Sequence, residues 1–317
     1  MLAAVTDQLD AGRNVEIREV DEPEVGPGES LVAIEAAAVA HFDLTILSGE
    51  FFAPPPLPFI AGAEAGGRVL ASETLEVGTR VRVGGAGVGV VRAGTWAERV
   101  AAPDAALEAL APEVDAGIAA TCFYAATTAE AALHTIGQLQ PGQRVAVTGA
   151  TGSVSDLTIQ LALRAGASKV VGFHRSAAQA DLIPAGAESV VWEGAATADR
   201  FRGDDAFDLV VDVVGGEALS LLATRSIKPG GAVAMVGYAA SDDLSVSITD
   251  LIVNDVRLLP VNTIRLEDEV RGAAQAMLSE VGSELQLRTT RLPLGEIDAA
   301  LDLLRGGTAG ARILVEP

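Results

Sequence analysis

The stretch RVAVTGATGSVSDLTIQLALRAGASKVVGFHRS, residues 144–176, decides the fold. It opens with a short apolar run, VAV, typical of a strand buried on both faces. Gly149 and Gly152 follow in a tight turn whose backbone a phosphate can approach closely. A helix stopped by Gly166 and a second apolar strand at 169–173 complete the pattern. The stretch therefore predicts a βαβ unit of the kind that binds a dinucleotide pyrophosphate at its helix N-terminus.

The glycine pattern of this turn is incomplete. Its third position holds Ser155, which is small enough to fit but removes the glycine that usually packs helix against sheet. One alternative is therefore a doubly wound sheet whose nucleotide site has decayed. If the site is intact, the turn and the first helical residues contact the nucleotide, and these are Gly149, Ala150, Thr151, Gly152, Ser153 and Val154.

Composition excludes several classes of protein. The 317 residues are 49% hydrophobic and 21% charged, which indicates a globular chain long enough for two domains. The net charge of −21 argues against nucleic acid or an anionic membrane as a partner, because both would be repelled. The single cysteine, Cys122, excludes an internal disulfide and a cysteine-rich zinc lobe. We see neither a signal peptide nor a membrane-spanning run, so we expect a cytoplasmic protein.

The chain changes character along its length. Up to about residue 112 it consists of short strand-like runs between turn residues, which predicts an antiparallel, barrel-like domain. An alanine-rich helix over 116–136 follows, and from 144 to about 259 strands and helices alternate, as a doubly wound parallel sheet requires. We expect the tail from 267 onward to return to the first domain.

These features, taken in order, resemble the medium-chain dehydrogenase/reductase superfamily, specifically its zinc-independent quinone oxidoreductase-like branch. The resemblance covers nearly the whole length. It is carried by VAIEAAAVAHFDLTILSGEF (32–51), PFIAGAEAGGRV (58–69), VAVTGATGSVS (145–155), FDLVVDVVGG (207–216) and IKPGGAVAMVG (227–237).

The resemblance implies a fold and an assembly. A GroES-like antiparallel β-barrel catalytic domain is expected over 1–121 and 263–317, and a Rossmann-type dinucleotide-binding domain over 122–262. The substrate is expected in the interdomain cleft. A homodimer would form through the edge strand near 258–262.

The same resemblance indicates a chemistry without metal. Zinc-dependent relatives carry ligands at the positions of Ala40, Ala63 and Tyr124, and none of these side chains can complete a zinc site. Phe42 replaces the hydroxyl of their proton relay. Reduction of a conjugated carbonyl, an enone or a quinone fits best, because conjugation spreads the developing negative charge.

Two residues are candidates for catalysis. The phenol of Tyr124 would point into the space of the lost metal and could donate a proton to the substrate, although tyrosine often serves packing alone. His41 occupies a position that lies near the pyrophosphate in relatives, but it can equally line the substrate pocket or be a buried, hydrogen-bonded histidine. We interpret Asp43 and Glu64 as structural carboxylates bonded to backbone or arginine.

The residues after the second βαβ strand indicate the cofactor. NAD enzymes place an acidic residue where this chain has His174, Arg175 and Ser176, all of which can donate to a phosphate. We therefore predict NADPH, unless Arg175 is simply a solvated surface residue. Further cofactor contacts are expected from the linking helix and the carboxyl edge of the later strands: Thr128, Val214, Gly215, Gly237, Tyr238 and Asn262.

The sequence thus predicts an NADPH-dependent reductase that acts on a small hydrophobic carbonyl or quinone. Two alternatives stay open. One is a metal-free dehydrogenase of ketones or secondary alcohols. The other is a family member with weakened nucleotide binding that works as a redox-neutral catalyst or as a non-catalytic protein.

Overall fold

The computed structural model describes two compact units of this chain. Unit 1 comprises Met1–Phe123 and Val281–Pro317, and unit 2 comprises Tyr124–Glu280. The described residues are 1–11, 13–49, 51, 53–111, 114–263, 265–281, 284–306 and 312–317, with only the backbone given for 121–122, 267–268 and 277–281. The side chain of Cys122 therefore lies outside the description. No helix among the described residues combines the length and apolarity needed to span a membrane.

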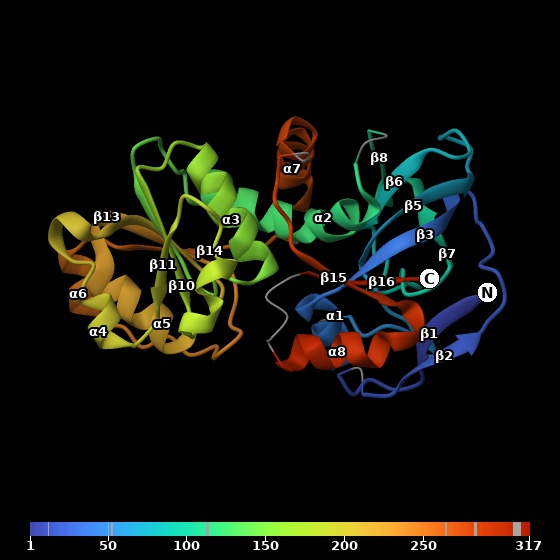
Figure 1. Cartoon of the computed structure of the whole chain (residues 1–317), viewed down its shortest axis with the longest axis horizontal. Coiled ribbons are helices and arrows are strands. Elements are labelled where there is room, and N and C mark those ends of the chain that lie inside the picture. Colours follow the sequence, from blue (N-terminus) through green and yellow to red (C-terminus); the bar gives the residue numbers. More distant parts are fainter. Residues whose placement is uncertain are drawn as a thin grey trace. The chain divides into compact units, whose positions relative to one another are not determined.

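Unit 2 is built on a parallel sheet whose strand order follows the doubly wound pattern. The order is β11-β10-β9-β12-β13-β14, with all described pairs parallel. This arrangement confirms the alternating strands and helices expected from the sequence (Figure 1). The strands are β9 (Arg144–Val147), β10 (Lys169–His174), β11 (Glu188–Val191), β12 (Phe207–Asp212), β13 (Ile227–Met235) and β14 (Arg257–Pro260).

The strands of unit 2 are apolar because helices cover them. Phe173 lies at the centre of the core, with the rings of Trp192, Phe201 and Phe207 at 5.3, 5.5 and 6.1 Å in edge-on orientations. The helices are α3 (Ser153–Arg164), α4 (Ala195–Ala198), α5 (Gly216–Leu221), α6 (Ile248–Val253) and α7 (Glu267–Val281), with 3-10 turns η3 (Ala177–Leu182) and η4 (Gly203–Asp205) and π-helical turns η2 (Ala131–Thr135) and η5 (Leu222–Ser226).

Unit 1 contains two sheets that are antiparallel with one exception. A larger sheet has the order β15-β16-β3-β5-β6-β8, with β7 also paired to β3, and a smaller one has the order β2-β1-β4. The exception is the parallel pair β15–β16, because helix α8 carries the chain back between them. The strands are β1 (Leu2–Thr6), β2 (Val15–Glu19), β3 (Glu29–Val39), β4 (Phe59–Ile60), β5 (Glu64–Ala71), β6 (Arg80–Gly84), β7 (Arg99–Pro103), β8 (Leu107–Ala109), β15 (Thr289–Pro293) and β16 (Arg312–Glu316).

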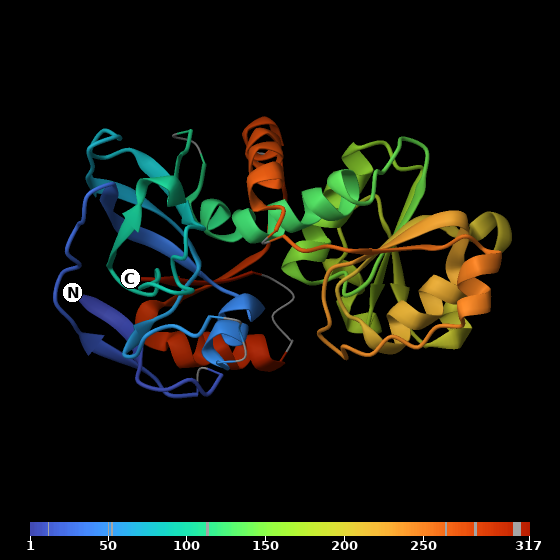
Figure 2. The ribbon, with the colours of Figure 1, turned by 180° about the vertical axis from the view of Figure 1, so that it is seen from behind.

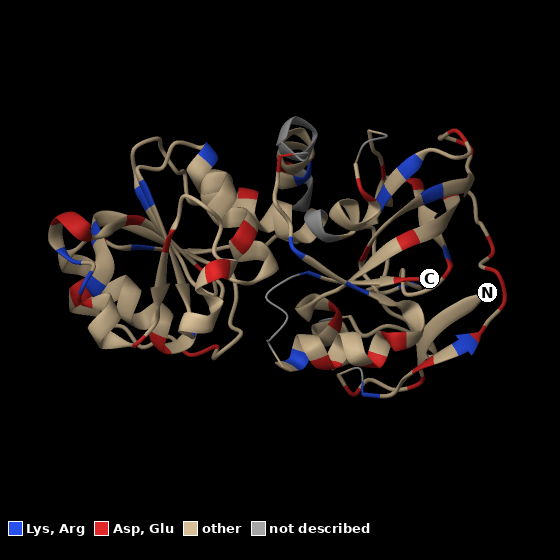
Figure 3. Cartoon of the chain, in the orientation of Figure 1, with Lys and Arg blue, Asp and Glu red and all other residues tan. Residues whose placement is uncertain are grey.

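The chain returns to unit 1 from Val281, later than the expected residue 267, because residues up to Glu280 group with unit 2. Strand β16 pairs with β3, and α8 (Ile297–Gly306) packs along the larger sheet (Figure 2). Helix α1 (His41–Leu47) and the 3-10 turns η1 (Asp104–Ala106) and η6 (Leu294–Glu296) are the other short helical elements. The core includes the fully buried Trp96, whose indole N–H donates to the Ala38 carbonyl at 2.8 Å. Acidic residues are spread over the elements of both units (Figure 3).

The predicted alanine-rich helix is α2 (Ala116–Glu130), which continues into the π-helical turn η2. The boundary between the units falls within α2. Residues 263–280 group with unit 2, because Leu266 and Val270 pack against Ala131.

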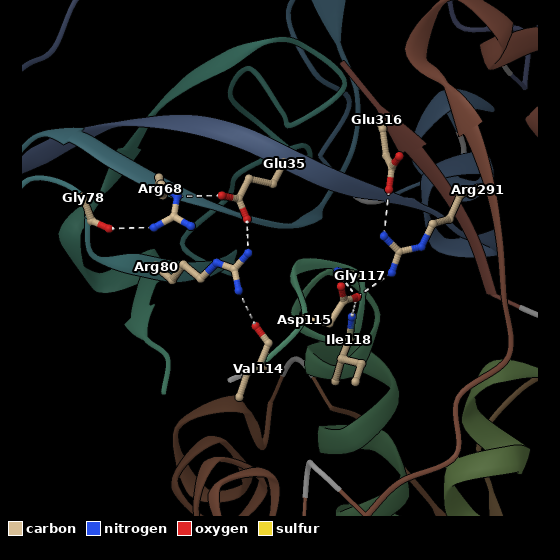
Figure 4. Close-up of polar contacts among 10 residues, drawn as sticks. All are labelled: Glu35, Arg68, Gly78, Arg80, Val114, Asp115, Gly117, Ile118, Arg291 and Glu316. Carbon is tan, nitrogen blue, oxygen red and sulfur yellow. Dashed lines mark hydrogen bonds and ion pairs between the residues drawn. The ribbon is translucent and has the colours of Figure 1, made fainter. Parts of the chain in front are cut away.

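The first turn of α2 is held firmly on unit 1 (Figure 4). The Asp115 carboxylate accepts from the backbone N–H groups of Gly117 and Ile118 at 2.8 and 3.3 Å and pairs with Arg291. Arg291 also reaches Glu316 at 2.8 Å, which joins the C-terminal strand to this helix end.

Candidate functional site

The glycine turn after β9 has the geometry that the sequence predicts. Gly149 has a φ of +56°, a conformation that side chains disfavour, and a Cβ there would lie 2.9 Å from Val213. The N–H of Gly152 donates to the Gly149 carbonyl at 2.9 Å and closes the turn. The N–H of Ala150 donates to the Phe173 carbonyl at 2.9 Å, which fixes the turn against β10.

The turn leads directly into α3, whose N-terminal residue is capped by Gly152. Because the N-cap residue is a glycine, it has no side chain that could accept a hydrogen bond from the first turn. The Ser155 hydroxyl instead donates to the Thr148 carbonyl at 2.8 Å and is fully buried below the turn. Serine therefore fits in place of the expected glycine, because its hydroxyl has an acceptor within the protein.

A buried carboxylate supports this turn from the next strand. Asp212 ends β12 with no exposed surface. It accepts from the Thr148 hydroxyl at 2.6 Å and from the Gly215 N–H at 2.7 Å. Thr148 in turn accepts from the Val213 N–H at 3.0 Å. Burial raises the pKa of Asp212, while its hydrogen bonds oppose that rise. The network joins the end of β9 to the loop that follows β12.

Two more loops meet at this carboxyl edge of the sheet. The N–H of Ala240 donates to the Val214 carbonyl at 2.8 Å, and Gly215 forms a bridge with Ser241. A Cβ on Gly237 would lie 2.6 Å from the Val213 carbonyl, so only glycine allows this approach. The structure therefore brings together the glycine turn, the 213–216 loop and the 237–241 loop. Tyr238, on the last of these, is 67% exposed.

The residues expected to read the ribose differ in their surroundings. His174 is 3% exposed, and its ring nitrogens lie 2.9 Å from the Ser176 carbonyl and 2.7 Å from the Ser189 hydroxyl. Because both ring nitrogens form hydrogen bonds within the protein, the imidazole is a fixed part of the end of β10. Arg175 and Ser176 are exposed just beyond it. The groups that face solvent at this position are thus a guanidinium and a hydroxyl.

The two remaining predicted cofactor residues lie on other elements. Thr128 is half-buried on α2. Asn262 follows β14, where its side-chain oxygen accepts from the Arg265 N–H at 3.1 Å. Among the described residues, neither side chain hydrogen-bonds to the three loops.

A second buried aspartate organises the start of α1 in unit 1. The Asp43 carboxylate accepts from the N–H groups of Ala40 at 2.8 Å and Ala63 at 3.0 Å. These bonds confirm that Asp43 is structural, and they hold together the two positions that carry metal ligands in zinc-dependent relatives. Burial raises the pKa of Asp43 to about 7, against the effect of its hydrogen bonds. Glu64, at the start of β5, is also buried.

The predicted catalytic residues lie on two helices. His41 is the first residue of α1 and is exposed, although the protein around its ring lowers the pKa of the imidazole by desolvation. Phe42 packs edge-on against Phe51 with ring centres 5.5 Å apart. Tyr124 is half-buried on α2, and its carbonyl accepts from the Thr127 hydroxyl. The catalytic roles of His41 and Tyr124 stay predictions.

The donor set does not fit a metal ion. Positions 40 and 63 carry methyl groups, and the Asp43 carboxylate accepts hydrogen bonds from the N–H groups of both residues. Within the described residues, no group of three or more His, Cys, Asp or Glu side chains could hold a metal.

Asp212 and Thr148 are the residues that reading the sequence missed. A signal was present, because an aspartate ends an apolar run directly before the Val-Val-Gly-Gly turn. A charge at the end of a strand buried on both faces needs partners, and the adjacent loop N–H groups supply them.

Two family models match the chain. The alcohol dehydrogenase GroES-like domain matches residues 26–112, and the zinc-binding dehydrogenase model matches residues 153–279. The two segments lie in units 1 and 2, respectively.

Known proteins resemble the chain along most of its length. Quinone oxidoreductase-like protein 2 of Mus musculus is 29% identical over 76% of this chain and 69% of its own. The probable acrylyl-CoA reductase of Escherichia coli is 25% identical over 86% of each chain. A quinone oxidoreductase of Thermus thermophilus, whose structures include a complex with NADPH, has a TM-score of 0.83 and 25% identity, with all of both chains covered.

Proposed function

Because the chain belongs to the medium-chain dehydrogenase/reductase superfamily, in its quinone oxidoreductase-like branch, we propose that it is a zinc-independent, NADPH-dependent reductase of conjugated carbonyls, enones or quinones. The observation that carries this proposal is the arrangement at the carboxyl edge of the unit 2 sheet. There the Gly149 turn, the 213–216 loop and the 237–241 loop are tied together around Asp212.

The residues at this edge fit a dinucleotide. The first turn of α3 offers backbone N–H groups to the pyrophosphate, and the helix dipole favours its negative charge. Gly215 and Gly237 keep side chains out of the neighbouring loops, so the backbone can approach the ribose of the nicotinamide. When bound, the reduced cofactor supplies a hydride to the substrate.

Arg175 and Ser176 favour NADPH over NADH. Both are exposed after β10, and the segment HRSAA, 174–178, contains no carboxylate to accept from a ribose 2′-hydroxyl. A guanidinium suits a phosphate through paired N–H donors. His174 contributes by position rather than by contact, because its hydrogen bonds to Ser176 and Ser189 fix the end of the strand.

Zinc independence is supported by the donor set in unit 1. Asp43 accepts hydrogen bonds from the backbone N–H groups of Ala40 and Ala63, and the side chains at these two positions are methyl groups, which cannot bind a metal. Without a Lewis acid, a conjugated acceptor is favoured, since its own π-system carries the charge that arrives with the hydride. A proton then neutralises the product oxygen or carbon, and the phenol Oη of Tyr124 or a water molecule donates it.

We also propose a homodimer formed through β14. This strand lies at the end of the unit 2 sheet, with one side paired to β13. Helix α6 precedes it, and Ile248, Ile252 and Val253 on that helix are 73, 73 and 74% exposed. Light scattering should give twice the chain mass, and Ile252→Asp together with Val253→Asp should shift the protein toward the monomer.

Steady-state kinetics with purified protein test the reductase proposal. NADPH should be oxidised with 1,4-benzoquinone and with an enone, and much more slowly with a simple ketone. Preference for the ketone would favour the ketone or secondary-alcohol dehydrogenase. Failure of millimolar NADPH to bind in a fluorescence titration would favour the redox-neutral or non-catalytic alternative.

Arg175→Ala should raise the KM for NADPH about tenfold and leave that for NADH unchanged.

A further inference from the structure

Unit 2 contains a pocket that the proposed function does not use. It lies among η5, the adjoining end of α5 and the start of α6, and it has a volume of about 530 Å³. This volume lies in the range of small-molecule sites, which is roughly 300–1,000 Å³. Helices α4, α5 and α6 all contact η5 and lie close together in the ribbon of unit 2 (Figure 1).

Two arginines line one side of the pocket and share a single carboxylate. Arg225 Nη1 lies 3.2 Å from both oxygens of Asp199, and Arg202 Nη2 lies 2.5 Å from one of them. A guanidinium has five N–H donors, so each arginine keeps donors for a ligand. Arg202, Arg225 and Asp199 together carry one net positive charge in a chain whose net charge is −21, and Asp250 is the carboxylate elsewhere in the lining. This side of the pocket therefore suits an anion.

The rest of the lining suits hydroxyl groups. The exposed carboxylate of Asp250 can accept hydrogen bonds from a ligand. Ser247 accepts from the Asp250 N–H at 3.2 Å, which leaves its own O–H to donate. Ser220 has a different role, because it accepts from the Ser245 N–H at 3.0 Å and donates to the Gly216 carbonyl at 2.8 Å, so it fixes the pocket wall.

We propose that this pocket binds a small polyhydroxylated anion, such as a sugar phosphate. The anionic group pairs with Arg202 and Arg225, and the hydroxyls of the ligand reach Asp250 and Ser247. The site is separate from the glycine turn after β9, and the proposal stands whether or not the chain is a reductase.

Isothermal titration calorimetry with glycerol 3-phosphate tests the proposal, with inorganic phosphate and glycerol as comparison ligands. Glycerol 3-phosphate should bind more tightly than phosphate, and glycerol should not bind measurably. Arg225→Gln should weaken glycerol 3-phosphate binding about tenfold, the effect of losing one charged hydrogen-bonding group, and Arg202→Gln should do the same. Asp250→Asn should reduce the advantage of glycerol 3-phosphate over phosphate.

Two matched variants separate this pocket from other anion sites. Arg200→Gln removes a neighbouring exposed arginine outside the pocket lining, and Arg175→Gln removes the arginine of the proposed NADPH site. Both should bind glycerol 3-phosphate like the wild type. Three results would overturn the proposal. They are loss of binding in Arg175→Gln alone, equal binding in all variants, and no binding of glycerol 3-phosphate to the wild type at about 10 mM.

Discussion

Each unit of this protein contains a fully buried aspartate beside its candidate site, and the two are used differently. In unit 2, Asp212 accepts hydrogen bonds from the Thr148 hydroxyl and from the Gly215 N–H. In unit 1, the Asp43 carboxylate accepts hydrogen bonds from the backbone N–H groups of Ala40 and Ala63. Asp212 thus links a side chain and a loop from different strands, whereas Asp43 joins two backbone segments directly, and our proposal that unit 2 binds a dinucleotide and unit 1 no metal builds on this difference.

The largest effect is expected from Asp212→Ala. The change leaves the Thr148 hydroxyl and the Gly215 N–H without their acceptor, which should lower the free energy of unfolding by roughly 2–5 kcal/mol. NADPH binding should weaken as well, because the turn and the 213–216 loop lose their link. Urea unfolding followed by Trp192 fluorescence in a Trp96→Phe background measures the first effect. Asp204→Asn, at an exposed position of the same unit, is the control. Equal stability of the two variants would contradict this account of Asp212.

Asp43 makes the stability of unit 1 depend on pH. The pKa of Asp43 is about 7 in the folded protein and 3.8 ordinarily, so between these values the folded chain holds the extra proton. The free energy of unfolding therefore falls as the pH rises through this window. Asp43→Asn does not titrate, so the stability advantage of the wild type over this variant should shrink by roughly 1–3 kcal/mol between pH 5 and pH 8.

Trp96 fluorescence in a Trp192→Phe background reports on unit 1 and measures this difference. Asp21→Asn, at an exposed position of unit 1, should leave the pH dependence as it is in the wild type. An advantage that stays constant from pH 5 to pH 8 would show that Asp43 does not titrate in this range.

A smaller effect is expected from Ser155→Ala. The variant loses one buried hydrogen bond to the Thr148 carbonyl, which should cost about 1 kcal/mol of stability. The affinity for NADPH should change less than twofold, because the hydroxyl lies below the turn and faces the strand. A large loss of NADPH affinity, measured by fluorescence titration, would mean that Ser155 contacts the nucleotide directly.

The smallest effect is expected at the anchor of α2. Although burial opposes it, the hydrogen bond from Arg291 holds the pKa of Asp115 below its ordinary value. The stabilisation is therefore present above pH 4 and is lost as the pH falls through the folded pKa. Asp115→Asn should cost no more than about 1 kcal/mol at pH 7, because the pair is partly exposed, and less in high salt. Urea unfolding at two salt concentrations checks this, and a cost that grows with salt would contradict it.

Much of the fold could be predicted because its signals are local. The glycine turn and the apolar strands of unit 2 follow from residues close together in sequence, and the final strand of the tail was expected in the first domain, although its pairing with β3 was not predicted. The parallel pairing of β15 with β16 could not be predicted, since it depends on how α8 packs between them.

The candidate site, too, could be predicted only where its signals are local in the sequence. The loops at Gly149, Val214 and Gly237 were predicted from strand ends, and the structure groups them. The support from Asp212 was not predicted, because its partner Thr148 is 64 residues away in the chain. The engagement of both His174 nitrogens likewise depends on Ser189 from the neighbouring strand.

The most direct test of the whole account is the rate of NADPH oxidation by 1,4-benzoquinone before and after exhaustive dialysis against a chelator, with the metal content measured in the same samples. Turnover should be unchanged when less than about a tenth of an equivalent of metal remains. Turnover that disappears on chelation and returns with added zinc would contradict it.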